Sequence, residues 1–271
     1  MGFIRDLLSS IFNPNKSTAE IGQPSKTWQD EVDAVVKETP VVTVPKVPPT
    51  PDVVMHIGGD PAVNGVELHE TEMTKKSIIN DIIAVEGGYV DHSSDLGGET
   101  NYGITYATAN KATTKKKLVA MGWDGKMRNL TKEMAYVVYE IEYWNRMNLD
   151  AIFAISPFLA DKLFDQGVNV GVTRSAKWLQ RALNAFNRRQ KDYKDIIADG
   201  GIGNETMKAL NAFIAKRGRG PAVTVLLYAL VGMQANHYIT ISEEREANED
   251  FTFGWFMERL SHNIRLYFDK K

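Results

Sequence analysis

Two carboxylates near one predicted helix end have the types and spacing for acid–base chemistry. The first, Glu86, ends a predicted helix whose apolar face is formed by Ile78, Ile79, Ile82, Ile83 and Val85. Gly87 and Gly88 follow and predict the helix stop. A carboxyl group beside an apolar face, at the negative end of a helix dipole, is expected to have a raised pKa. This environment fits a general acid better than a salt-bridge partner.

The second carboxylate, Asp95, lies nine residues later in a polar, glycine-rich segment without helical periodicity. We expect it to be solvated and ionised. A neutral acid and an anionic partner across a cleft are what hydrolysis of a glycosidic bond requires. Taken singly, each residue also has an ordinary explanation, because a Glu before Gly-Gly is often an exposed helix end and Asp-x-Gly-Gly is often a turn.

The elements that must position these carboxylates follow directly in the chain. Thr100, Tyr102 and Thr105 surround Gly103 in a short run of β-forming residues. This pattern predicts a small β-hairpin that brings hydroxyl groups back toward the two carboxylates. His92 lies within the same stretch and, as a group that titrates near neutral pH, is either a modulator of the site or an exposed loop residue.

Composition excludes several classes of site. The chain of 271 residues has no cysteine, which excludes disulfides, thiolate zinc sites and a cysteine nucleophile. Its net charge of -2 gives no basic excess for nucleic-acid binding. The five histidines show no ligand spacing, so we expect no metal and no cofactor. We find no secretory signal and no apolar run of roughly 18 residues, the length that spans a bilayer.

The first 71 residues differ from the rest. Residues 1–14 can form a short amphipathic helix, which is either an anchor for a membrane surface or partner, or a segment that packs on the protein itself. Residues 15–71 contain a proline-rich stretch from Pro40 to Pro51 that favours an extended spacer. We therefore predict an extended N-terminal arm.

From residue 72 onward, the pattern is helical almost to the end. We expect helices over 105–121, from an N-cap at Thr131, from Pro157, from Thr173 and over 207–216, followed by a long buried helix that includes 222–233. Glu140 and Glu142 are expected to be surface charges.

The complete string around the two carboxylates is more specific than its parts. E-G-G-Y from Glu86, eight intervening residues, and then D-x-G-G-x-T-x-Y-G-I-T from Asp95 resemble the signature of glycoside hydrolase family 108. These enzymes are N-acetylmuramidases, largely from phages and prophages of Gram-negative bacteria. The spacing also resembles that of phage-type lysozymes, in which five residues usually separate the Asp from the Thr. Here four residues precede Thr100 and nine precede Thr105, so the choice of threonine stays open.

A second resemblance lies in the C-terminal half. Its motifs resemble the predicted peptidoglycan-binding domain that follows the catalytic module in this family, and together the two resemblances cover about residues 72–268. The motifs are Phe164-Asp165, Asn169-x-Gly171, Leu179-Gln180-x-Ala182-Leu183, Asp199 to Thr206, and Gly254-Trp255 with Arg259.

The resemblance implies a mainly α, lysozyme-like α+β fold with a small β-hairpin near the active site. It implies a muramidase catalytic domain over 72–156 and a helical peptidoglycan-binding domain over 157–271. The implied reaction cleaves the β-1,4 bond from N-acetylmuramic acid to N-acetylglucosamine, and the implied partner is peptidoglycan. Glu86 would be the acid, Asp95 the base or charge stabiliser, and Thr100 the holder of the water. Candidate substrate contacts are Tyr89, Tyr102, Thr105 and Asn169.

Two other functions stay open from the residues alone. A lytic transglycosylase also uses one Glu, although it needs no second carboxylate. A non-catalytic wall-binding part of a virion or secretion machine would fit the N-terminal arm. If the chain is an enzyme, it is either a free endolysin that depends on a holin or a virion-attached lysin anchored through residues 1–14. We expect a monomer, made in the host cytoplasm without a signal peptide, that acts on periplasmic peptidoglycan.

Overall fold

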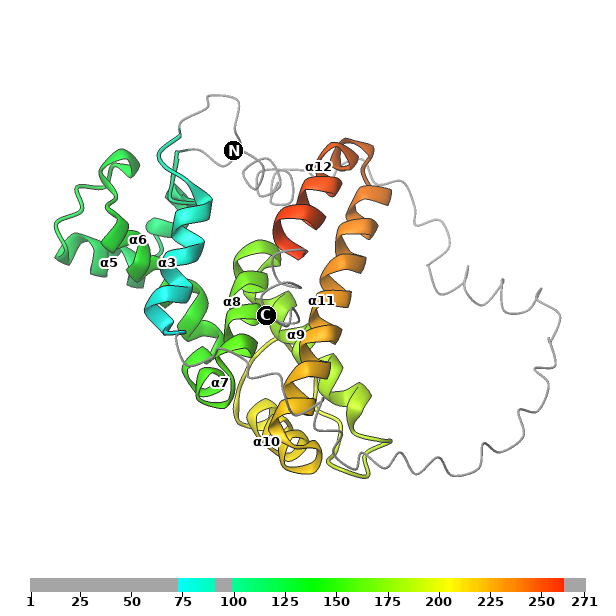
Figure 1. Cartoon of the computed structure of the whole chain (residues 1–271). Helices are drawn as coiled ribbons and strands as arrows, with labels where there is room; N and C mark the ends of the chain where they lie inside the picture. Colours follow the sequence, from blue (N-terminus) through cyan, green and yellow to red (C-terminus); the bar gives the residue numbers. More distant parts are fainter. Residues whose placement is uncertain (1–72, 91–98, 261–271) are drawn as a thin grey trace, which may run out of the picture. The chain divides into compact units, whose positions relative to one another are not determined.

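The computed structural model describes residues 73–90 and 99–260 (Figure 1). The predicted helix over 1–14, the predicted linker over 15–71, and His92 and Asp95 lie outside the described residues. The predictions for these segments therefore stay predictions.

Helix α3 (Lys75–Glu86) carries the first candidate carboxylate at its last residue. It begins at a capping box, in which the hydroxyl of Thr74 accepts from the backbone N–H of Ser77 and the hydroxyl of Ser77 accepts from the backbone N–H of Thr74. Its four isoleucines are buried, while Val85 in the last turn is 69% exposed and does not extend the apolar face into the core. Gly87 ends the helix with φ of 81°, a value that favours glycine.

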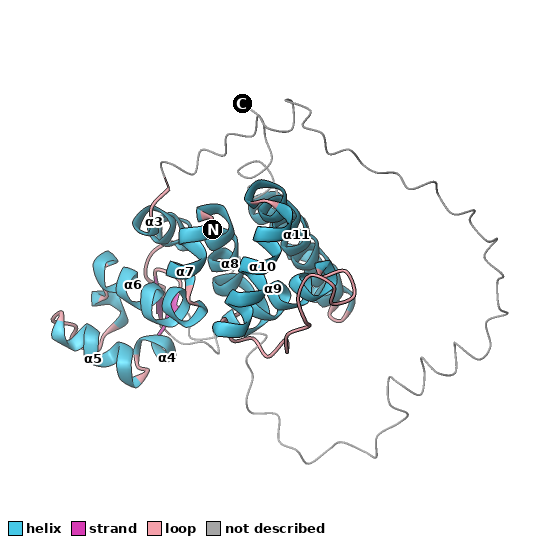
Figure 2. Ribbon diagram, turned by 90° about the horizontal axis from the view of Figure 1, so that it is seen from below, coloured by secondary structure: helices cyan, strands magenta, loops and turns pink. Residues whose placement is uncertain are grey.

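The predicted hairpin is present. Strands β1 (Thr100–Asn101) and β2 (Ile104–Thr105) pair antiparallel, with Thr100 opposite Thr105. Tyr102 and Gly103 make the turn with φ of 50° and 73°, as a two-residue hairpin requires. The buried amide of Asn101 donates to the carbonyls of Met127 and Leu130, which fixes the hairpin to the following segment. Figure 2 shows the hairpin surrounded by helices.

The helix expected over residues 105–121 is two helices, α4 (Tyr106–Ala109) and α5 (Ala112–Ala120). The single-helix prediction was wrong because the side chain of Asn110 donates to the carbonyl of Tyr106, and Lys111 is not helical, with ψ of 138°. The elements that follow are η2 (Met127–Asn129), α6 (Lys132–Tyr139), the π-helical turn η3 (Glu140–Trp144), η4 (Asn145–Met147) and α7 (Leu149–Ile155). Thr131 caps α6 as predicted.

The C-terminal half is also helical, as expected. Pro157 occupies the first turn of α8, and the hydroxyl of Ser156 caps it. The elements are α8 (Pro157–Val170), α9 (Val172–Phe186), α10 (Asn204–Arg217), α11 (Arg219–Glu243), η5 (Glu246–Asn248), α12 (Glu249–Trp255) and η6 (Phe256–Leu260). The fold is thus mainly α with one small hairpin, as predicted.

Helix α8 lies at the centre of the described residues. It packs against α7, α9 and α11, and most of its residues are buried (Figure 1). Phe164 contacts the rings of Tyr139 and Trp144, which precede it, while Leu163 and Leu230 of α11 share the same apolar cluster. One hydrophobic core therefore joins the part of the chain that carries Glu86 to the C-terminal helices.

Helix α11 is, within residues 73–90 and 99–260, the one helix long and apolar enough to cross a bilayer, with a mean hydropathy of 1.2. A core helix of a soluble protein meets the same criterion. Leu226 and Leu227 are buried in the core, and Gln234 on the same helix is buried and hydrogen-bonded to Tyr238. These contacts support the predicted core helix.

Candidate active site

The turn of the hairpin lies directly against Glu86. A Cβ atom added to Gly103 would be 2.8 Å from the Cβ of Glu86 and 2.7 Å from the hydroxyl of Tyr139. That hydroxyl donates to the carbonyl of Tyr102 at 2.9 Å. Glycine at residue 103 therefore serves two purposes, since it permits the positive φ and leaves room for the Glu86 side chain.

Glu86 is paired with an arginine from the far end of the chain. The guanidinium of Arg259 in η6 lies 2.7 Å from Oε1 of Glu86 and 2.8 Å from Oδ1 of Asp165 in α8. The expectation that Glu86 would not be a salt-bridge partner was wrong. Its partner is 173 residues away in sequence, and nothing in the local pattern at Glu86 indicated it.

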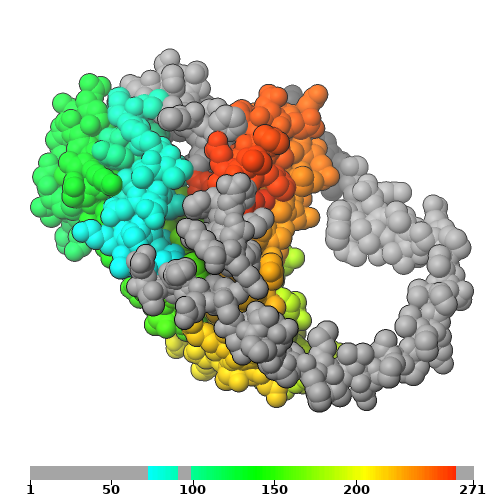
Figure 3. Space-filling model, in the orientation of Figure 1, coloured from blue at the N-terminus to red at the C-terminus, as the bar shows by residue number. Residues whose placement is uncertain are grey.

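The side chains of Glu86, Arg259 and Asp165 are all buried. The exposed side-chain fractions are 5% for Glu86, 9% for Arg259 and 8% for Asp165. In Figure 3, the surfaces of α3 and of α12 with η6 are both visible on the viewed face.

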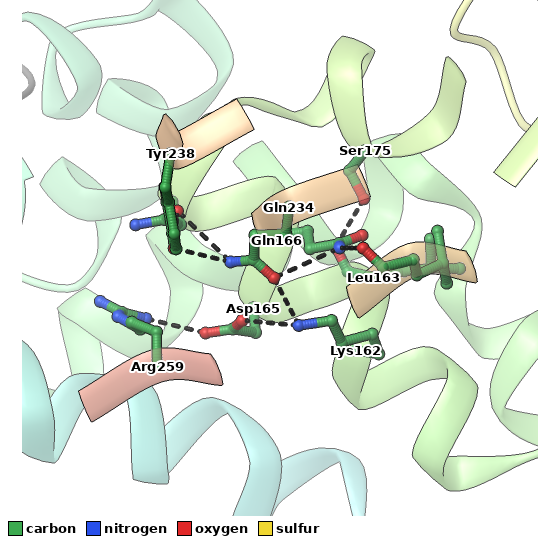
Figure 4. A network of polar contacts seen from close by, with 10 residues as sticks. Lys162, Leu163, Asp165, Gln166, Ser175, Gln234, Tyr238 and Arg259 are labelled. Carbon is green, nitrogen blue, oxygen red and sulfur yellow. Dashed lines mark hydrogen bonds and ion pairs between the residues drawn. The ribbon is translucent and has the colours of Figure 1, made fainter. Parts of the chain in front are cut away.

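Asp165 links the arginine to a second buried cation, Lys162. Their charged atoms are 3.6 Å apart, and the Lys162 ammonium also donates to Gln234 (Figure 4). Burial opposes ionisation of Asp165, but the positive charges of Arg259 and Lys162 lower its pKa below the usual value. Burial lowers the pKa of Lys162 to about 8, and Asp165 partly opposes that shift. The pKa of Arg259 is raised by Asp165 and Glu86 against the effect of burial.

Asn169 belongs to this interior network. Asn169 is only 2% exposed, and its side-chain oxygen accepts from the hydroxyl of Tyr238 at 2.7 Å. Helix α8 is largely buried and its Asn169 amide is bonded to Tyr238 of α11, and the predicted substrate contact at Asn169 stays a prediction. Its role in the structure is to join the two helices.

The two threonines have different surroundings. The backbone of Thr100 forms two hydrogen bonds with that of Val90, at 2.9 and 3.0 Å. This β-bridge joins the hairpin to the segment that follows Glu86. Thr105 is the N-cap of α4, and its hydroxyl accepts from the backbone N–H of Thr108 and lies 3.1 Å from the Thr108 hydroxyl. Its predicted contact with substrate therefore competes with a structural hydrogen bond.

The two candidate tyrosines, Tyr89 and Tyr102, are both half-buried. Tyr89 donates from its hydroxyl to Glu99 at 3.2 Å, and the guanidinium of Arg128 lies 5.6 Å from its ring centre. Tyr102 occupies the hairpin turn. Their predicted stacking on sugars stays a prediction.

Glu142 is a buried carboxylate that the sequence misplaced on the surface. It is 7% exposed, accepts from the hydroxyl of Thr114, and pairs with Lys111 at 2.7 Å. Glu140 instead pairs with Lys75 at 2.7 Å and remains partly exposed. The π-helical turn shifts the helix face at these residues, which a 3.6-residue period does not anticipate. In the described part of the chain, no group of three histidines and carboxylates could hold a metal ion.

Two known protein families match segments of this chain. Residues 79–171 match the family Glycosyl hydrolase 108, and residues 174–260 match the Predicted Peptidoglycan domain. The two matched segments meet after α8, whereas the predicted boundary precedes α8; the predicted domain limits stay a prediction. No curated protein matches the chain.

The solved structure of SagA from Brucella abortus is 25% identical in sequence, with a TM-score of 0.46. The similarity covers 71% of this chain and 92% of the SagA chain. From the two domain matches, we conclude that this chain carries a glycosyl hydrolase 108 domain followed by a predicted peptidoglycan domain.

Proposed function

We propose that the protein is a peptidoglycan hydrolase of the N-acetylmuramidase type, with Glu86 as its general acid. The observation that carries the proposal is the position of Glu86, at the end of α3 and against the hairpin turn, inside the segment that matches glycosyl hydrolase 108. The adjoining peptidoglycan domain supports the choice of substrate.

The proposed reaction is a hydrolysis with two carboxylate roles. Glu86 gives its proton to the bridging oxygen as the bond from that oxygen to C1 of N-acetylmuramic acid breaks. The oxygen of a water molecule then bonds to C1, and the water proton passes to Asp95 as the base. The products are a reducing N-acetylmuramic acid end and a free 4-hydroxyl on N-acetylglucosamine. We favour inversion at C1, for which the two carboxyl groups must lie about 6.5–9.5 Å apart.

The second candidate reaction is that of a lytic transglycosylase. In that reaction, the 6-hydroxyl oxygen of the muramic acid bonds to C1 in place of water, and its proton passes to the deprotonated Glu86. The product then carries a 1,6-anhydro end. Asp95 at the hydrolase spacing favours the muramidase.

Product analysis distinguishes these reactions. Purified protein is incubated with isolated Gram-negative peptidoglycan, and the soluble fragments are identified by mass spectrometry. Reducing muramic ends are the expected result, and anhydro ends would establish the transglycosylase instead. Retained wall binding without any fragments would favour the third reading, a non-catalytic wall-binding protein.

We further propose a phage or prophage setting in which the enzyme acts on periplasmic peptidoglycan, either as a free endolysin or as a virion-attached lysin. Residues 1–14 are the proposed anchor. A variant lacking residues 1–60 should keep its activity on isolated peptidoglycan and lose its association with membrane or particle. Association that persists in this variant would contradict the anchor.

A further inference from the structure

We infer that Arg259, in the peptidoglycan domain, is a positioning residue for Glu86, so that the active site is complete only with the C-terminal helices in place. This inference rests on the proposed function of Glu86. Arg259 reaches both Glu86 and Asp165 within 2.8 Å, although α3, α8 and η6 are far apart in the chain.

The arginine is held by more than Glu86. Asp165 accepts from the other guanidinium nitrogen of Arg259 and also pairs with Lys162 (Figure 4). With Glu86, the buried cluster contains two carboxylates and two cations. A buried ion pair is weak evidence for stability, because apolar residues of similar volume often serve as well. Its position on the candidate acid points instead to a task in the reaction.

The contact divides the two oxygens of the Glu86 carboxyl group. Arg259 donates to Oε1 at 2.7 Å, so the proton that Glu86 gives to the substrate is carried on Oε2. As that proton moves to the bridging oxygen, negative charge develops on Glu86 beside a fixed guanidinium. Such preorganised charge stabilises the transition state more than the ground state.

The test compares kcat and KM on soluble glycan oligomers for Arg259→Met, Arg259→Lys and Asp165→Asn. Arg245→Met is the matched control, since Arg245 is an exposed arginine of the same domain. We expect Arg259→Met to lower kcat by about 100-fold, as loss of one preorganised donor does, with little change in KM. Arg259→Lys should recover part of kcat. The kcat of Asp165→Asn should lie between those of Arg259→Met and the wild type.

Circular dichroism and thermal melting establish that each variant is folded, and Arg259→Gln replaces the methionine variant if the latter does not fold. Unchanged or increased kcat in a folded Arg259 variant would overturn the inference, the increase by showing that the contact restrains Glu86. A decrease in kcat/KM that comes from KM alone, with kcat unchanged, would also overturn it. Failure of the wild-type protein to release fragments would instead refute the proposed function.

A separate observation leads to a second proposal, which concerns a groove between α9 and α11. Its volume is about 910 Å³, and its walls include Arg174, Arg181, Asn184, Met233, Asn236 and His237. We propose that this α9–α11 groove binds the carboxylate-bearing peptide stem of peptidoglycan. The proposal deepens the proposed function by assigning the wall-binding surface.

The charges of the groove favour an anionic ligand. Its described walls contain two exposed arginines and no carboxylate. Burial and the charge of Arg174 lower the pKa of His237 to about 4, so His237 is neutral at pH 7 and its Nε2 accepts from Arg174 at 3.1 Å. Arg174 is thereby oriented, while Arg181 makes no ion pair with any residue that the structure describes.

The groove suits a peptide stem better than a neutral sugar. A sugar ring stacks on an exposed aromatic face, but Trp178 in this groove is only 6% exposed, and the partly buried Phe186 already stacks on Phe213. Guanidinium groups match carboxylates in shape and charge. Peptide stems carry carboxylates, whereas N-acetylglucosamine has none.

The test measures binding of the full-length Glu86→Gln protein to intact sacculi and to the glycan strands that remain after an amidase has removed the stems. We expect binding to intact sacculi that Arg174→Glu or Arg181→Glu weakens by about 10-fold, since each substitution removes one charge-assisted hydrogen bond to the ligand. Lys177→Glu, an exposed residue of α9 outside the groove, is the matched control and should bind like its parent.

Equal binding to stem-free glycan strands, or binding that the two arginine variants do not change, would overturn this proposal and leave the proposed function intact. Absence of binding in a protein whose wild type still releases fragments would do the same. Absence of both binding and fragments would count against the proposed function itself.

Discussion

Gly103 in the hairpin turn lies directly against Glu86 at the end of α3, so close that a Cβ at residue 103 would be 2.8 Å from the Cβ of Glu86. The turn residue and the candidate acid come from different elements, β-hairpin and α3. The contact makes the position of the acid depend on the backbone of the turn.

Gly103→Ala should therefore damage both stability and activity. Its φ of 73° and the clash with Glu86 together should lower the free energy of unfolding by at least about 2 kcal/mol. Gly122→Ala is the control, because Gly122 has φ of 92° and no neighbour within 4 Å, and it should lose only about 1 kcal/mol. Denaturant unfolding and kcat are measured for both. Equal effects of the two substitutions would mean that the contact with Glu86 is unimportant.

Thr105→Ala should act through helix α4. Loss of the cap should reduce the free energy of unfolding by about 0.5–2 kcal/mol, while Thr105→Ser keeps the hydroxyl and restores stability. We expect Thr100→Ala to lower kcat more than Thr105→Ala does, because Thr100 remains the proposed holder of the water. A larger kcat loss at Thr105, with stability unchanged, would reverse the assignment of the two threonines.

Lys162 should make stability depend on pH. Its folded-state pKa of about 8 lies below the ordinary value of 10.5, so between these values the unfolded state binds more protons. The contribution of Lys162 to the free energy of unfolding therefore rises as pH increases from about 8 toward 10.5. Denaturant unfolding of the wild type and Lys162→Met at neutral pH and at about pH 9 should show this rise only in the wild type. Parallel pH dependence in the two proteins would contradict it.

Local patterns were sufficient for much of the fold. The isoleucines of α3, the two glycines after Glu86 and the β-formers around Gly103 each act within a few residues, and the structure has the helix, its stop and the hairpin they predicted. Helix starts at Thr131 and Pro157 follow from similarly local hydrogen bonds and φ restraints.

The relationships missed are those between distant segments. Arg259 belongs to a recognisable C-terminal motif, but its two carboxylate partners depend on how η6 packs against α3 and α8. The hydrogen bond between Asn169 and Tyr238 of α11 is a second such relationship, because its partners lie 69 residues apart in the chain. Glu142 was misplaced because a π-helical turn changes which side chains face inward.

The central claim is that Glu86 is the acid, and the most direct measurement is the rate of fragment release from peptidoglycan by Glu86→Gln. Glu140→Gln is the control, since Glu140 is a partly exposed carboxylate paired with Lys75. We predict that Glu86→Gln is folded and bound to peptidoglycan but releases no reducing muramic ends, while Glu140→Gln behaves like the wild type. Substantial release by folded Glu86→Gln would contradict the assignment.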